Sequence, residues 1–177
     1  MKAITLWQPW ASLVAVGAKR YETRSWPAPK TLRVGDLLAI HAAGRSYDIS
    51  EIDTDGKLLR ACQTRRVWPL IALPHGEVVA ICRFGGCHRT GLLAPDEEEQ
   101  VVGDWSPGRY AWLLERVCRL APTIPARGYQ GLWDWEPPSE LREQLSMQER
   151  AVPTQLRMDE SDAPAGRRPE YEEGDGR

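Results

Sequence analysis

The stretch from Leu6 to Trp26, LWQPWASLVAVGAKRYETRSW, constrains the fold more than any other part of the chain. Its first half predicts a short amphipathic helix, because Pro9 suits a first helical turn and the apolar residues from Trp10 and Leu13 onward recur at helical spacing. Gly17 can end such a helix in the left-handed conformation. We therefore expect a helix that packs one face inward and stops just before a cluster of charged residues.

That charged cluster, residues 20–26, alternates like a strand. Successive side chains of a strand point to opposite faces, so Glu22, Arg24 and Trp26 are expected to share one face. Lys19 would then lie at the turn between helix and strand, free to join either face. The sequence thus predicts that cations, a carboxylate and a flat ring gather in one small region.

The remainder of the chain predicts short strands separated by turns and a few helices. Apolar runs or alternation indicate strands at 2–7, 37–43, 77–90 and 109–120, although the last pattern is also compatible with a helix. Helical patterns occupy 45–66, the residues after Pro95, and 140–147. Gly85-Gly86 predicts a bulge, and the Gly- and Trp-rich stretch 126–135 predicts a loop that closes one end of a barrel. We expect an α+β fold, a small β-barrel with two to four flanking helices.

The length of 177 residues fits one domain. We expect residues 1–148 to form it, and residues 149–177 to be a disordered acidic tail, because they are rich in Pro, Gly and charge and lack an apolar period. No apolar run approaches the roughly 20 residues that cross a bilayer, and the start lacks a signal peptide's apolar centre. These features predict a cytoplasmic protein that does not bind membranes.

Neither a metal nor a cofactor is expected. The four cysteines include no CxxC pair, and the three histidines have no ligand partners at suitable spacing. The net charge of −2 conceals a basic body, since residues 1–89 carry 13 Lys and Arg against 7 Asp and Glu. Residues 139–177 carry 6 against 10. A basic body of this kind can present an attractive face to phosphate.

The residues Gly17, Lys19, Glu22 and Arg24 form a G-x-K-x-x-E-x-R motif that closely resembles the mark of the activating signal cointegrator homology (ASCH) domain. The flanking QPWAS and SW agree with it, as do four later segments: LLAIHAA, GEVVAICRF, GDWSPGRYAWLLE and QGLWDW. The resemblance covers roughly residues 1–136. It implies a small β-barrel related to the RNA-binding PUA domains, with a cleft beside the motif, and it implies nucleic-acid binding.

The residue types fit a binding cleft, because cations contact phosphates and flat rings stack on bases. The candidate ligand-binding residues are Lys19, Arg24, Trp26, His41, Trp105 and Gln130. For His41, which lies in an apolar strand, a hydrogen-bonded core residue is the alternative interpretation. The expected partner is nucleic acid or a modified nucleoside. RNA, single-stranded DNA and a free nucleoside stay open, and no oligomeric state is assigned.

The resemblance also raises an enzymatic alternative. A branch that is similar in fold hydrolyses N4-acetylcytidine and related amides with a lysine, a threonine three residues later and a glutamate after the third strand. Lys19 matches the lysine, whereas Glu22 stands where the threonine would be. The acid would fall among Glu97, Glu98 and Glu99, so the candidate catalytic residues are Lys19, Glu22 and Glu98.

Glu22 favours a protonated Lys19 and Arg24 opposes it, and the sequence leaves open which influence prevails. Because Glu22 places a fixed charge where the related enzymes have a hydroxyl, turnover of N4-acetylcytidine is expected to be weak or absent. Ribonuclease activity, associated with some members, is a further alternative. In a purely structural alternative, a Glu22–Arg24 pair only fastens the first helix to the barrel.

Overall fold

The computed structural model describes residues 1–45 and 53–151, without the side chains of 148–151. The chain divides into two units, Met1–Glu136 and Pro137–Arg177. Most of the tail expected at 149–177 lies outside the described residues. Among the residues that are described, no helix has the length and apolarity that a membrane crossing needs.

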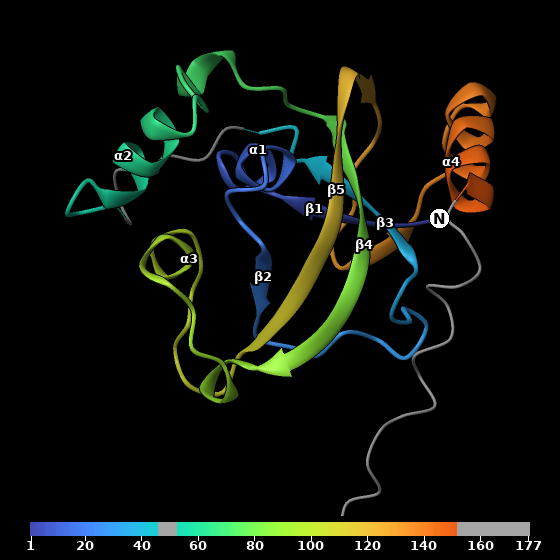
Figure 1. Ribbon diagram of the computed structural model, residues 1–177. Coiled ribbons are helices and arrows are strands. Elements are labelled where there is room, and N and C mark those ends of the chain that lie inside the picture. The colour runs from blue at the N-terminus through green and yellow to red at the C-terminus, as the bar shows by residue number, and fades with distance from the viewer. Residues whose placement is uncertain (46–52, 152–177) are drawn as a thin grey trace, which may run out of the picture. The chain divides into compact units, whose positions relative to one another are not determined.

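One six-stranded sheet forms the framework of the first unit (Figure 1). Its strands lie in the order β2 (Tyr21–Arg24), β5 (Tyr110–Pro125), β4 (Glu77–Arg89), β3 (Leu37–Ala42), β1 (Lys2–Leu6) and β6 (Leu132–Asp134). The β1–β3 pair is parallel and the other pairs are antiparallel. The sheet curls into part of a barrel, and helices flank it, which confirms the predicted α+β class.

The curl of the sheet follows from irregular pairing of its two longest strands. The register between β4 and β5 shifts at three places, the last of them between Phe84 and Gly86. A Cβ at Gly85 would lie 2.8 Å from the carboxylate end of the exposed Glu115 side chain, which would have to move aside. Because bulges bend and twist a strand, these shifts explain the curvature visible in Figure 1. The predicted Gly85-Gly86 bulge is confirmed.

The helices of the first unit are short: α1 (Trp10–Ala15), α2 (Lys57–Thr64) and α3 (Glu97–Val102). The first one begins after Pro9 and ends before Gly17, whose φ is +74°, as the sequence predicts. Of the helix predicted at 45–66, residues 57–64 are helical and 46–52 lie outside the described residues. In the second unit, the described residues contain α4 (Ser139–Ala151).

The loop predicted at 126–135 is wrong in its second half. Residues 126–131 carry no regular structure, but Leu132–Asp134 form β6 and pair with β1. The stretch predicted as a strand at 109–120 is the long strand β5. The three residues of β6 are too few to show a strand pattern in the sequence, and they follow a glycine. Their strand conformation depends on pairing with β1.

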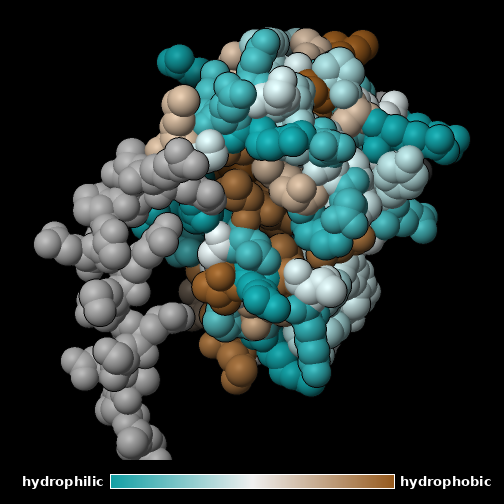
Figure 2. Space-filling model, turned by 90° about the vertical axis from the view of Figure 1, so that its right-hand side faces the viewer, coloured by the Kyte–Doolittle hydropathy of each residue, from teal (hydrophilic) through white to brown (hydrophobic). Residues whose placement is uncertain are grey.

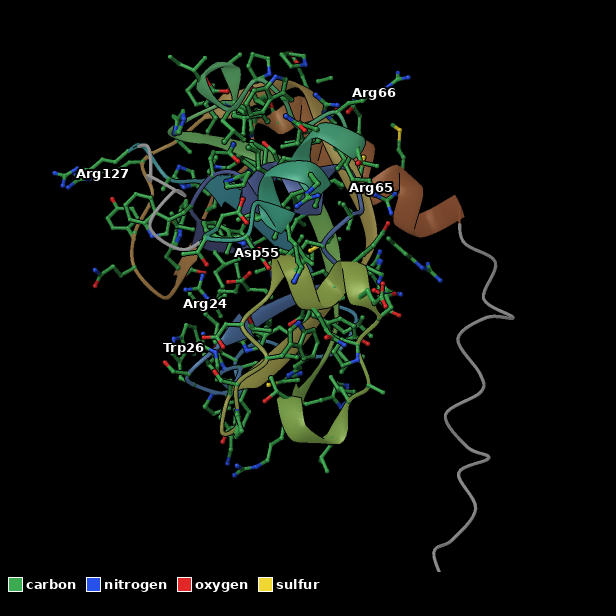
Figure 3. The ribbon with its side chains drawn as sticks, turned by 90° about the vertical axis from the view of Figure 1, so that its left-hand side faces the viewer. Arg24, Trp26, Asp55, Arg65, Arg66 and Arg127 are labelled. Atoms are coloured by element: carbon green, nitrogen blue, oxygen red, sulfur yellow. The ribbon has the colours of Figure 1, made fainter. Side chains whose placement is uncertain are left out.

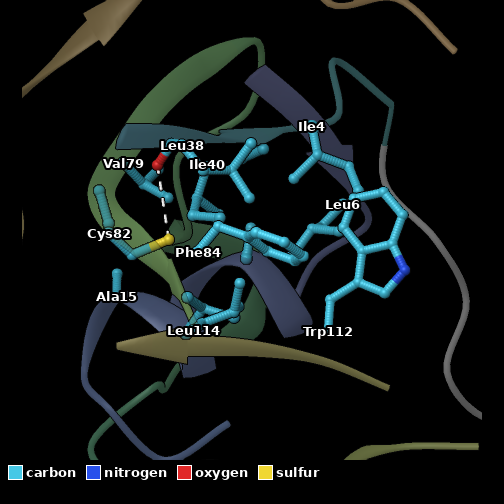
Figure 4. Packing of buried hydrophobic residues seen from close by; sticks show 14 of the residues in the cluster. Ile4, Leu6, Ala15, Leu38, Ile40, Val79, Cys82, Phe84, Trp112 and Leu114 are labelled. Carbon is cyan, nitrogen blue, oxygen red and sulfur yellow. Dashed lines mark hydrogen bonds between the residues drawn. The ribbon is translucent and has the colours of Figure 1, made fainter. Parts of the chain in front are cut away.

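The main core lies between α1 and the sheet (Figure 4). Trp112 is the largest fully buried side chain among the described residues and packs edge-on against both Phe84 and Trp26. The Cys82 thiol donates to the carbonyl of Leu38 at 3.5 Å. On the face that Figure 2 shows, hydrophilic residues are interspersed with apolar ones, as is usual for protein surfaces.

A second apolar cluster joins α1, α2 and α3. It comprises Leu13, Ala18, Leu58, Cys62, Val67 and Val102. Leu13 and Ala18 flank the turn after α1, and Val102 is the last residue of α3. This cluster therefore fixes the end of α3 beside the turn that carries Lys19.

Leu38→Ala tests the main core. Leu38 is fully buried in β3, so truncation should cost about 2–5 kcal/mol of unfolding free energy through lost burial and a cavity. Leu92→Ala is the matched control, because Leu92 is 81% exposed and should cost less than about 0.5 kcal/mol. Urea denaturation measures both. Similar losses for the two variants would contradict this packing.

Candidate functional site

The turn that ends α1 places Lys19 in the interior. The N–H groups of Ala18 and Lys19 both donate to the carbonyl of Leu13, at 2.9 and 3.1 Å. Lys19 is only 2% exposed. Its Nζ donates to the carbonyl of Val102 at 2.9 Å and lies 3.6 Å from Oε2 of Glu22. The ammonium group is therefore held between α3 and β2.

Burial lowers the pKa of Lys19 below its ordinary value, because an ammonium group loses its hydration there. The carboxylates of Glu22 and Glu99 oppose this effect, and Arg24 adds to it. Desolvation is the largest of these influences. From the sequence, Glu22 is expected to raise the pKa of Lys19 and Arg24 to lower it. In the structure, burial has a larger effect than either residue, and it lowers the pKa.

Glu99 is the acid that reaches this region. It is 1% exposed, and its carboxylate accepts from the backbone N–H groups of Arg20 and Tyr21, at distances from 2.9 to 3.2 Å. Its own N–H donates to Asp96, which caps α3, and its carbonyl accepts from Trp105 Nε1. Glu99 therefore fastens α3 to the first residues of β2.

Arg24 crosses the gap between the edge strand β2 and the end of β1. Its Nε lies 2.9 Å from Oε1 of Glu22, as expected for two residues on one face of a strand. Its Nη2 donates to the carbonyl of Thr5 at 3.1 Å, and its Cζ lies 6.0 Å from the ring centroid of Trp26. The Glu22–Arg24 pair of the structural alternative is present, and it joins β2 to β1.

Two cavities adjoin Arg24. The first, which we call the lysine cavity, has a volume of about 510 Å³. It is lined by Thr5, Leu6, Trp7, Trp10, Lys19, Glu22, Thr23, Arg24, Val101, Val102, Gly103, Asp104 and Arg109. Arg109 Nε lies 3.1 Å from Asp104 Oδ2, so the wall contains cations and carboxylates in close pairs.

The second, which we call the arginine cavity, has a volume of about 930 Å³ and shares Thr5, Trp7 and Arg24 with the first. Its cations are Arg24, Arg45 and Arg127, and none of the described residues that line it is a carboxylate. Its exposed rings are Trp7 (44%) and Tyr129 (51%). Figure 3 shows Arg24, Trp26 and Arg127 on the same side of the molecule.

His41 lies in the wall of the arginine cavity and is otherwise buried. Its Nε2 bonds the carbonyl of Ala126 at 3.0 Å, which requires Nε2 to carry a hydrogen. Burial lowers the pKa of His41, outweighing that hydrogen bond, so the ring is neutral at pH 7. His41 is thus both the hydrogen-bonded core residue and a residue of the cavity wall.

The other predicted residues have different surroundings. Gln130 is exposed and lines the arginine cavity. Trp105 lines neither cavity: its indole donates to Glu99 and packs edge-on against Tyr21. Glu98 pairs with Arg65 on the surface and, with Glu97, lines a separate cavity of about 400 Å³ beside α2. The structure therefore brings Glu99, and not Glu98, into the surroundings of Lys19.

Sequence reasoning missed several residues of the two cavities. Arg45, Arg127 and Tyr129 line the arginine cavity, and Thr23, Asp104 and Arg109 line the lysine cavity. A signal for two of them existed, because Arg127 and Tyr129 alternate with glycine in a stretch that was already expected to be a loop beside the barrel end. Arg45 carries no comparable signal.

The fold and these cavities define a curled-sheet α+β domain with a cationic, aromatic cavity beside the G-x-K-x-x-E-x-R motif. Residues 4–128 match the ASCH domain family. The chain therefore belongs to that family, which confirms the resemblance seen in the sequence.

Solved structures similar to this chain include ASCH from Zymomonas mobilis, at 14% identity and a TM-score of 0.46, covering 82% of this chain and 94% of that one. A crystal structure of a mutant of the same protein gives 14% identity and a TM-score of 0.45, with coverages of 82% and 96%. No curated protein matches the chain.

Glu99→Gln tests the fastening of α3 to β2. The amide keeps the size of the side chain but loses the charge and faces backbone N–H donors with a second donor, so unfolding should become easier by about 3 kcal/mol. Glu98→Gln is the control, because its exposed pair with Arg65 should contribute less than about 1 kcal/mol. Thermal unfolding and urea denaturation measure both. Equal effects would show that Glu99 does not hold this junction.

Lys19→Met tests the buried amine through pH. Because the pKa of Lys19 is lower in the folded chain, the unfolded chain binds more protons between that lowered pKa and the ordinary value of 10.5. Wild-type stability should therefore rise relative to the variant as the pH rises from 7 toward 10. Urea denaturation of both proteins across this range gives the difference. A difference that stays constant or falls would contradict a desolvated Lys19.

Proposed function

We propose that the protein binds single-stranded nucleic acid or a nucleotide in the arginine cavity. The observation that carries this proposal is the composition of the cavity wall: three arginines, exposed aromatic rings, and no carboxylate among the described lining residues. Arginine holds phosphate oxygens through charge-assisted hydrogen bonds, and flat rings stack on unpaired bases.

The dimensions and electrostatics of the site support an unpaired ligand. A volume of about 930 Å³ lies within the range of sites that enclose a small molecule, so a nucleotide can enter it. No carboxylate among the described residues lines this cavity, although Arg24 also pairs with Glu22 behind its wall, whereas in the lysine cavity Arg109 pairs with Asp104 in the wall itself. The stacking surface is supplied by Trp7 and Tyr129, because Trp26 also packs against Trp112.

Fluorescence anisotropy with a labelled single-stranded oligonucleotide tests the proposal. If three arginines contact phosphate, log affinity should fall with log salt with a slope of about −2. Arg45→Ala should weaken binding and reduce the slope by about 0.7, since one phosphate contact is lost. Arg119→Ala is the matched control, because Arg119 is exposed on β5 and lines neither cavity. Absence of binding at low salt, or equal losses in the two variants, would refute the proposal.

A second candidate function, amide hydrolysis of an N4-acylated cytidine, rests on the lysine cavity. Its support is a buried Lys19 with a lowered pKa, 3.6 Å from the carboxylate of Glu22. An unprotonated amine can act as a base or nucleophile toward an acyl carbon, and a carboxylate can carry the proton to the leaving amine. Thr23, the residue after Glu22, adds a hydroxyl to the same cavity.

Release of cytidine from N4-acetylcytidine, measured by chromatography, tests this second function. Turnover should be slow at neutral pH and rise with pH, because Glu22 favours the protonated lysine and the free amine is the reactive form. Lys19→Met should abolish it. If Lys19→Met still releases cytidine, or if the wild-type protein releases none at any pH, then Lys19 does not hydrolyse this amide.

A further inference from the structure

The segment 126–131 supplies an unusual share of the arginine cavity. All six of its residues line that cavity, and they include Arg127 and Tyr129. Arg127 Cζ lies 5.4 Å from the ring centroid of Tyr129, and Tyr129 in turn packs against Trp133. The guanidinium and the ring of this segment therefore lie together at one wall, as a phosphate contact and a stacking contact would need.

This segment has no regular secondary structure, so its position depends on what it rests against. Gly128 rests on the ring of His41: a Cβ at Gly128 would lie 2.3 Å from Cε1 and 2.6 Å from Nδ1 of that ring. Two residues earlier, the carbonyl of Ala126 accepts the hydrogen of His41 Nε2. The ring itself packs against Trp133. His41 thus fixes the segment at two points, Ala126 and Gly128, which flank Arg127 in the chain.

The remaining nitrogen of His41, Nδ1, is buried and has no hydrogen-bond partner within the part of the chain that the structure describes. A buried polar atom without a partner costs stability, so a residue chosen for packing alone would be apolar here. The atom that does bond, Nε2, bonds the segment that carries Arg127 and Tyr129. This points to a role of His41 in the site.

We propose that His41 is a positioning residue that holds the 126–131 segment, through Ala126 and Gly128, in the place where Arg127 and Tyr129 contact the ligand. The proposal rests on the proposed function, in that it assigns a part of the same binding site. His41 acts through the segment, and glycine is required at 128 because a side chain there would collide with the histidine ring and displace the segment.

Two substitutions disturb the support and leave Arg127 and Tyr129 unchanged. His41→Phe keeps the ring packed on Trp133 but cannot donate to Ala126. Gly128→Ala leaves His41 intact and adds a methyl group that collides with it. The matched control for the second is Gly91→Ala, because Gly91 has no atom within 4 Å of a Cβ and no left-handed backbone. Unfolding measurements confirm that each variant is folded before its binding is compared.

The decisive measurement is a double-mutant cycle in oligonucleotide affinity at low salt. His41→Phe and Gly128→Ala should each weaken binding at least about threefold, and Gly91→Ala should not. In a protein that already carries Arg127→Ala and Tyr129→Ala, the same His41→Phe change should have no further effect, because the groups it positions are gone.

Three outcomes would overturn this inference while leaving the proposed function in place. His41→Phe could bind like the wild type, or it could weaken binding equally with and without Arg127 and Tyr129, which would make His41 a direct contact. The Arg127→Ala, Tyr129→Ala protein could also bind like the wild type. Wild-type protein that binds no oligonucleotide would refute both the proposed function and this inference.

Discussion

The buried carboxylate of Glu99 is the contact on which the rest of the site depends. It accepts hydrogen bonds from the backbone N–H groups of Arg20, just before β2, and Tyr21, its first residue, and its helix is capped by Asp96 and anchored by Trp105. This junction brings the end of α3 over the turn after α1, where the carbonyl of Val102 meets the ammonium group of Lys19. Because charged groups are costly to bury unless they are hydrogen-bonded, the lysine cavity can exist only where these contacts satisfy one another.

Arg24 connects β2, which Glu99 holds in place, to β1. The sheet order leaves β2 and β1 unpaired with each other, and Arg24 bridges them by holding Glu22 and the Thr5 carbonyl together. On one side of this bridge lies the lysine cavity, where carboxylates neutralise the cations. On the other side lies the arginine cavity, whose described wall contains arginines and no carboxylate. The same residue therefore separates a region suited to proton chemistry from a region suited to binding anions.

Much of this arrangement follows from local rules. The Pro9 start, the Gly17 stop and the strand alternation of residues 20–26 predict the helix, the turn and the shared face of Glu22 and Arg24, and a glycine pair predicts the bulge in β4. The choice among Glu97, Glu98 and Glu99 could not be predicted, because all three share a short helix and only its docking on β2 decides which one is buried. Trp105 was expected to bind ligand, but its indole is used to hold Glu99. Arg45 and Arg127 come from distant parts of the chain, and only the fold brings them into one cavity.

Tryptophan indole signals offer the most direct test of the central claim that ligand enters the arginine cavity. In a ¹⁵N-labelled protein titrated with a short single-stranded oligonucleotide, the indole N–H signal of Trp26, which lines only the arginine cavity of the two, should shift, together with that of Trp7. The signals of Trp10, in the lysine cavity, and of Trp105 and Trp112, which line neither cavity, should stay in place. A shift of Trp10 with no change at Trp26 would contradict the account and place the ligand beside Lys19 instead.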